Sequence, residues 1–172
     1  MNKIIVPVDF SEQSEYALKV AASLAKKHDS AILALHMLEL TQAMITSSEG
    51  FHPEQTVFLI KIAEKRFNDF LDKPYLKDVK ISPIIKHYKV FSEINEVAKE
   101  HEVDLVIMGS HGTDGLREIF IGSNAEKVVR NSDIPVLVIK KEILDFKVNR
   151  MVFASDFKSE SIKAFEKARE FT

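Results

Sequence analysis

Short apolar runs rich in β-branched residues alternate with amphipathic stretches along most of this chain. The runs span residues 4–8, 31–37, 79–88, 105–108 and 135–139. Between them, apolar residues recur at helical spacing over residues 12–24, 57–71, 92–101 and 123–130. Strands that alternate with helices predict an α/β fold whose parallel sheet is covered on both faces. Pro83, within the third run, favours the start of a strand or a sheet edge.

Length and charge narrow the classes of partner. The 172 residues suffice for one full domain, and 24 Lys and Arg are balanced by 26 Asp and Glu. Nucleic acid and anionic membranes are therefore not expected partners. The chain has no cysteine, and no apolar run approaches the roughly 20 residues of a membrane span. With no secretory segment at the amino terminus, we expect a cytoplasmic protein.

Four of the five glycines fall between Gly109 and Gly122, directly after the apolar run 105–108. Glycines at the carboxyl end of a buried strand let the backbone turn sharply and approach a ligand closely. The N–H groups of a following helix then face an anion. This placement predicts a ligand that carries phosphate.

The spacing Gly109, two residues, Gly112, nine residues, Gly122-Ser123 resembles the ATP-binding signature of the universal stress protein family. The resemblance runs from Asn2 to about Lys141 and includes Val6-Pro7-Val8-Asp9-Phe10-Ser11-Glu12 at the start. It implies an open five-stranded parallel sheet with helices on both faces, Rossmann-like and of the adenine nucleotide alpha hydrolase type. The nucleotide would lie at the carboxyl ends of the strands.

The resemblance implies a set of residues that bind an adenine nucleotide. Residues at the end of the first strand would contact adenine and ribose, and the Met37 backbone would read the base edge. Residues after the fourth strand would line the ribose and bring N–H groups to the phosphates. Asp9 has an alternative role as a helix cap, and Asn124 as an ordinary first-turn residue. The set comprises Pro7, Val8, Asp9, Met37, Met108, Gly109, Gly112, Gly122, Ser123 and Asn124.

Several other side chains invite a functional interpretation that the sequence does not favour. Ser110-His111 lacks the Gly-x-Ser-x-Gly frame of a nucleophile elbow, so we name no catalytic residue. His36 lies in an apolar run, which favours a core role, and the histidines show no metal-ligand spacing. In place of the glycine and proline usual in the family, the chain has Tyr88-Lys89-Val90-Phe91. Tyr88 or Phe91 could cover the ribose or fill the core.

These features predict a universal stress protein that binds ATP as a signal or structural ligand, with ADP and AMP as alternatives. Mg²⁺ would arrive with the nucleotide. No Gly-x-x-x-x-Gly-Lys-Ser/Thr loop is present, so at most slow hydrolysis is expected. The resemblance also implies a homodimer through the edge of the fifth strand. The rival hypothesis is a dimerisation or interaction module of the same fold that has lost nucleotide binding.

Two further classes are disfavoured by what the sequence lacks. A related ligase or sulfurtransferase would carry Ser-Gly-Gly-x-Asp-Ser or His-x-Gly-His after an early strand, and neither is present. A phosphoacceptor receiver domain needs an acidic pair after the first strand, an aspartate ending the third and a lysine ending the fifth. Only Asp9 and Lys140 come close.

The last residues repeat the first. Asn149-Arg150-Met151-Val152-Phe153-Ala154-Ser155-Asp156-Phe157 echoes Asn2-Lys3-Ile4-Ile5-Val6-Pro7-Val8-Asp9-Phe10 at a constant offset of 147 (149 minus 2). We therefore expect a complete domain over 1–142 and the first strand and helix of a second repeat over 147–172. A tandem protein shortened after the start of its second domain would have this pattern. The alternative is a chance match between two amphipathic strand-helix units.

Overall fold

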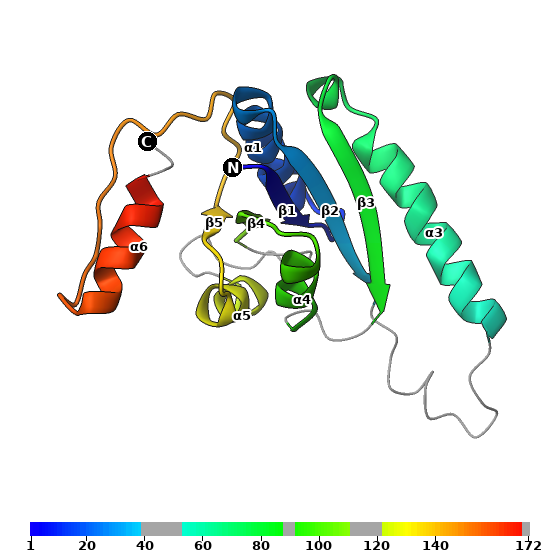
Figure 1. The fold of residues 1–172 in the computed structure, drawn as a ribbon. Helices are drawn as coiled ribbons and strands as arrows, with labels where there is room; N and C mark the ends of the chain where they lie inside the picture. Colours follow the sequence, from blue (N-terminus) through cyan, green and yellow to red (C-terminus); the bar gives the residue numbers. More distant parts are fainter. Residues whose placement is uncertain (39–52, 88–91, 111–121, 170–172) are drawn as a thin grey trace.

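The computed structural model describes residues 1–38, 53–87, 92–110 and 122–169. Its elements alternate between strand and helix, as the apolar runs predict (Figure 1). The strands are β1 (Lys3–Pro7), β2 (Ala31–Leu38), β3 (Lys80–His87), β4 (Leu105–Gly109) and β5 (Val136–Ile139). The helices are α1 (Glu12–His28), α3 (Pro53–Leu71), the short 3₁₀ helix η1 (Pro74–Leu76), α4 (Ser92–Glu100), α5 (Ser123–Asn131) and α6 (Ser159–Arg169).

All five strands form one parallel sheet in the order β3-β2-β1-β4-β5. Ile4 and Ile5 of β1 lie opposite Leu105 and Val106 of β4, and Pro7 lies opposite Leu35 of β2. The chain builds the sheet outward from β1 to β3 on one side and then crosses to β4 and β5 on the other. The predicted five-stranded open parallel sheet is confirmed.

Helices cover both faces of this sheet because successive strand residues point to opposite sides. Ile4 and Val6 pack in one core cluster with α1 and with Phe67 of α3, whereas Ile5 packs in the other. That second cluster contains Ile94 and Val97 of α4 together with Ala125 and Val128 of α5. The sheet is therefore the middle layer of three.

Local sequence explains where α1 begins and ends. The Ser11 side chain accepts a hydrogen bond from the Ser14 N–H, and Glu12 and Glu15 place negative charge in the first turn. At the other end, three basic residues occupy the last turn and Asp29 adopts a left-handed conformation at the C-cap. The helix that we expected over residues 57–71 begins earlier, at Pro53, a residue type favoured at the first helical position.

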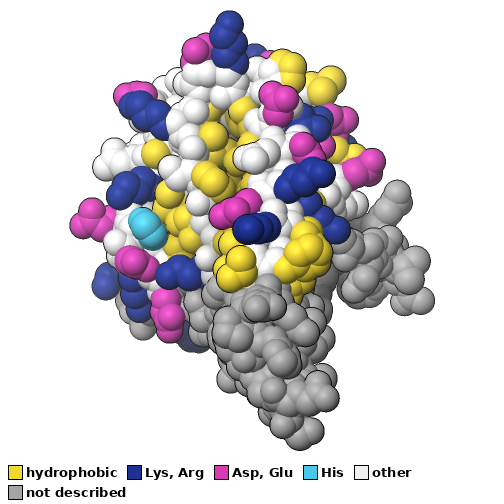
Figure 2. All heavy atoms as spheres, turned by 90° about the vertical axis from the view of Figure 1, so that its right-hand side faces the viewer, with side chains coloured by type: hydrophobic (Ala, Val, Ile, Leu, Met, Phe, Trp, Pro, Cys, Tyr) yellow, Lys and Arg dark blue, Asp and Glu magenta, His cyan; other side chains and the backbone are white. Residues whose placement is uncertain are grey.

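The β3 side of the molecule is the outer edge of the sheet, as Pro83 predicts. Figure 2 shows this side, where hydrophobic side chains form a band flanked by charged ones. Val57, Phe58 and Ile62 of α3 are among the large exposed hydrophobic residues. None of the helices in the described ranges is long and apolar enough to cross a membrane.

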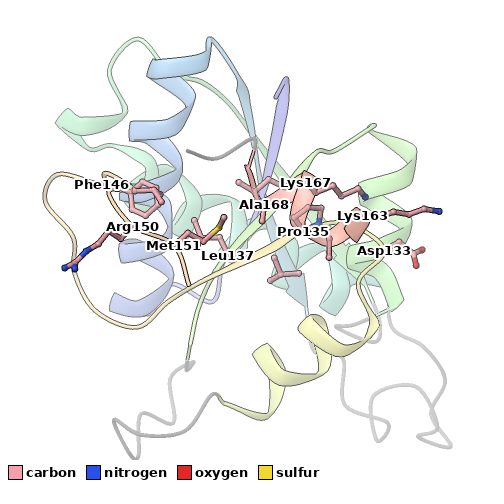
Figure 3. A pocket seen from close by; sticks show the side chains of 13 residues that line it. Asp133, Pro135, Leu137, Phe146, Arg150, Met151, Lys163, Lys167 and Ala168 are labelled. Atoms are coloured by element: carbon pink, nitrogen blue, oxygen red, sulfur yellow. The ribbon is translucent and has the colours of Figure 1, made fainter. Parts of the chain in front are cut away.

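The C-terminal unit, residues 149–169, differs from the expectation in one respect. Its helix forms as α6, but no strand forms over residues 149–157. The prediction of an extra strand here was wrong. A strand needs a neighbour for its backbone hydrogen bonds, and in the described structure these residues pair with no strand of the sheet. A cavity of ≈ 660 Å³ separates β5 from α6 (Figure 3).

Candidate functional site

The strand order reverses between β1 and β4, and the predicted site residues gather there. Because parallel strands end at the same edge, Pro7, Val8 and Asp9 of the β1 end lie beside the end of β4, which carries Met108 and Gly109. In open α/β sheets, ligands bind outside the carboxyl ends of strands at such a switch point. The topology thus joins segments that are a hundred residues apart in sequence.

Asp9 holds the turn between β1 and α1. Its Oδ1 accepts a hydrogen bond from the Ser11 N–H at 3.0 Å and another from the Ser11 hydroxyl. Ser11, not Asp9, is the N-cap residue of α1. Asp9 is exposed, and within the described residues its Oδ2 accepts no hydrogen bond. The alternative role as a cap is therefore indirect, and among the described residues no hydrogen-bond donor to Oδ2 would compete with a ligand.

His36 of β2 supports the end of β1 from the side. Its Nδ1 lies 2.7 Å from the Val8 carbonyl oxygen, and since a carbonyl only accepts, Nδ1 carries the proton. Burial lowers the pKa of His36 below its ordinary value, so the ring is neutral at pH 7. Its ring packs 4.5 Å from that of Phe10 and 6.1 Å from that of Phe67. His36 is a satisfied, half-buried packing residue, as predicted.

Phe10 adopts a left-handed backbone conformation, with φ of 64°. This region is uncommon for a bulky side chain. Its ring contacts Phe67 and Phe70 of α3 in edge-to-face geometry, at 5.2 and 5.6 Å between centroids. These contacts offset the strain and fix the direction in which the chain leaves β1.

Gly109 ends β4 against the first turns of α1. A Cβ at this position would lie 2.8 Å from the backbone of Gln13, closer than atoms of these types approach. Glycine is therefore required here by packing between α1 and β4, whether or not a ligand binds. The sequence pattern did not reveal this contact, because nothing near Gly109 in the chain indicates that Gln13 lies over it.

Ser110 ties the start of α5 to the sheet. Its N–H donates to the Ile139 carbonyl of β5 at 2.9 Å, and its carbonyl accepts from the Gly122 N–H at 2.6 Å. The residue is buried, which fits a structural role better than that of a nucleophile. Gly112 and His111 belong to residues 111–121, which lie outside the described part of the chain.

Helix α5 begins next to Ser110, just beyond the end of β4. Gly122 is its N-cap residue and Ser123 its first residue. A glycine cap has no side-chain oxygen to bond the N–H groups of the first turn, and these groups carry the positive end of the helix dipole. Asn124, in the same turn, is exposed. The arrangement can therefore accept an anion.

Comparison with known proteins agrees with this geometry. The model of the universal stress protein family matches residues 1–140. The chain belongs to the universal stress protein family. Universal stress protein MJ0577 of Methanocaldococcus jannaschii is 32% identical over 157 residues, which cover 82% of this chain and 96% of the relative. The solved structure of MJ0577 matches with a TM-score of 0.68 at 33% identity, over 80% of this chain and 94% of that one.

Two universal stress proteins of Archaeoglobus fulgidus share the fold at lower identity. One was solved in complex with dAMP and matches with a TM-score of 0.56 at 17% identity, over 80% of this chain and 97% of that chain. The other, from strain DSM 4304, matches with a TM-score of 0.52 at 21% identity. That match covers 82% of this chain but only 44% of the other, so the second protein is much the longer.

The structure describes only some of the remaining residues that were predicted to form the site of this universal stress protein domain. Met37 lies in β2, one residue beyond His36, and is half-buried. Tyr88 and Phe91 lie outside the described residues, so their predicted roles stay predictions. In the described ranges, no three His, Cys, Asp or Glu side chains cluster as metal ligands.

Proposed function

We propose that this universal stress protein binds an adenine nucleotide at the carboxyl ends of β1 and β4. The observation that carries the proposal is the glycine-capped start of α5, which the Ser110–Gly122 hydrogen bond holds beside the sheet. ATP is the proposed ligand, with ADP and AMP as alternatives. The A. fulgidus relative solved in complex with dAMP supports an adenine nucleotide.

The nucleotide would extend from β1 toward α5. Adenine and ribose would lie near Pro7, Val8 and Asp9, with Oδ2 of Asp9 accepting a hydrogen bond from a ribose hydroxyl or the adenine amino group. The Met37 backbone would meet the base edge, and Met108 and Gly109 would line the ribose. The phosphates would accept hydrogen bonds from N–H groups at Gly112 and Ser123, and Gly122, whose own N–H donates to the Ser110 carbonyl, would leave room for them. Asn124 would reach the terminal phosphate.

Bound ATP would act as a signal in a stress response, with at most slow hydrolysis. The chain has no Walker lysine to meet the β- and γ-phosphates. Mg²⁺ would enter with the triphosphate and neutralise part of its charge. The proposed role is therefore that of a cytoplasmic sensor or switch.

A second candidate function rests on the edge of β5. Val136, Leu137 and Val138 are only half-buried, and β5 pairs with β4 alone in the described structure. An apolar open edge favours pairing with another chain. We propose that two copies meet through this edge. A module that dimerises in this way without binding nucleotide is the alternative to the switch.

The test is to denature the purified protein, identify released nucleotides by mass spectrometry, and titrate ATP, ADP and AMP with Mg²⁺ by calorimetry. Gly122→Val is the matched variant. Because φ of Gly122 is −57°, valine fits the backbone, and lost binding would report on the space for phosphate. Binding lost in Gly122→Val, with unfolding unchanged, supports the proposal. A protein that ignores all three nucleotides is instead an interaction module.

A further inference from the structure

The C-terminal unit reproduces the backbone of the β1–α1 connection as well as its sequence. Phe157, the counterpart of Phe10, has a φ of 60° against 64° for Phe10. The Asp156 Oδ1 accepts a hydrogen bond from the N–H two residues on at 3.1 Å, as the Asp9 Oδ1 does at 3.0 Å. Helix α6 begins at residue 159 and α1 at residue 12, which preserves the offset of 147.

The unit also keeps the contact between its two arms. Phe153 and Phe165 pack edge to face with ring centroids 5.2 Å apart. Their counterparts, Val6 and Leu18, belong to one core cluster of the first domain. Residues 149–169 therefore keep the turn, the helix and the contact between the two segments although residues 149–157 pair with no strand of the described sheet.

The apolar side chains that this shape should bury are uncovered. Val152 is 97% exposed, whereas its counterpart Ile5 is fully buried. Phe157 is 96% exposed, whereas Phe10 packs against three aromatic rings. Phe165 is 40% exposed, against none for Leu18. Exposed apolar groups that recur at core positions mark a surface that another part must cover.

The first domain does not cover this surface. The cavity between β5 and α6 is lined by Pro135, Val136 and Leu137 on one side and by Ala164 and Ala168 on the other. Figure 3 shows Lys163, Lys167 and Ala168 on the helix across from Pro135 and Leu137. A well-packed interface would not leave an open pocket of this size between its two sides. α6 thus lies near β5 without burying the apolar face of the unit.

We infer that residues 149–169 are a docking element for a polypeptide that supplies counterparts of β2 and β4. The first domain shows what this partner must present. Ile5 lies between Leu33 of β2 and Val106 of β4, in parallel register on both sides. What would cover the unit is therefore the rest of a second copy of this fold, from its second strand onward. The longer A. fulgidus relative shows that the fold occurs in chains with room for a second copy.

The chain's own sequence provides the probe. Thr172 is the counterpart of Ala25, so appending residues 26–141 after Thr172 continues the second repeat in register. Hydrogen exchange at the amides of residues 151–155 is the measurement. In the 172-residue chain these amides should exchange rapidly, since no strand forms there. In the extended protein they should exchange about 100-fold more slowly or better, because the new strand pairs on both sides.

Two matched proteins accompany this test. In the extended protein, Val152→Asp should restore rapid exchange, because the aspartate would lie between the new strands. Replacing residues 149–172 with residues 2–25 gives a duplicate with the authentic β1–α1 unit, which sets full protection. The inference is overturned if residues 151–155 are already protected in the 172-residue chain. It is also overturned if they stay unprotected in the extended protein while the duplicate is protected.

Discussion

The β1–α1 unit and the C-terminal unit are two copies of one pattern in different surroundings. Both make the same left-handed turn at phenylalanine, the same aspartate hydrogen bond and a helix at the same position. Only the first makes a strand, and only the first buries its apolar residues. Turn and helix therefore follow from local sequence, whereas the strand and the core depend on β2 and β4.

The largest expected difference between the copies is in the stability that each apolar residue contributes. Ile5→Ala should lower the free energy of unfolding by about 2–5 kcal/mol, because it opens a cavity between β2 and β4. Val152→Ala should change it by no more than about 0.5 kcal/mol, since its side chain is exposed. Urea denaturation followed by circular dichroism measures both. Equal losses in the two variants would show that the C-terminal unit is part of the first core.

The second prediction concerns the helix packing that only the first copy makes. Gly109→Ala should destabilise the protein by about 1–3 kcal/mol, because the new Cβ meets the Gln13 backbone and α1 must shift. Gly122→Ala, whose φ suits any residue, is the control and should cost about 1 kcal/mol or less. Thermal unfolding of the two variants compares them. If Gly109→Ala leaves the unfolding temperature unchanged, the close contact between Gln13 of α1 and the end of β4 does not exist.

The smallest expected effect is a pH dependence of stability that arises from His36. The His36 ring packs on Phe10, whereas Phe157, the counterpart of Phe10, is exposed. Burial holds the folded-state pKa of His36 below its ordinary value of 6.5. The unfolded state therefore binds a proton first, and stability should fall as the pH drops below 6.5. His36→Asn keeps a donor for the Val8 carbonyl but cannot titrate. Its unfolding free energy should decline less between pH 7 and pH 5, and an identical decline would remove His36 as the cause.

Much of the fold could be predicted because its signals are local. The apolar runs mark the five strands, Ser11 marks the start of α1, and Pro83 marks an edge strand. Prediction from the sequence was wrong where a feature depends on residues far away in the chain. The strand over 149–157 does not form, since a repeated sequence brings no neighbour with it.

The candidate site shows the same division. The glycine spacing predicts a phosphate site, and the structure places Gly122 at the cap of α5 beside the sheet. The same spacing gave no sign that Gly109 is fixed by Gln13, or that Ser110 joins β5 to α5. Both contacts cross between distant segments. Asp9 shows both kinds of feature. Its turn depends on the neighbouring Ser11, whereas its position beside the end of β4 depends on the sheet.

Asp9 and Asp156 provide the most direct test of a nucleotide site at the end of β1. Asp9 and Asp156 make the same turn, but only Asp9 lies at the carboxyl end of a sheet. ATP binding with Mg²⁺ should be measured by calorimetry for the wild-type chain, Asp9→Ala and Asp156→Ala. The affinity should be about 10- to 100-fold weaker in Asp9→Ala and unchanged in Asp156→Ala. Equal affinity in all three proteins, or no binding by the wild-type chain, would contradict a nucleotide site at the end of β1.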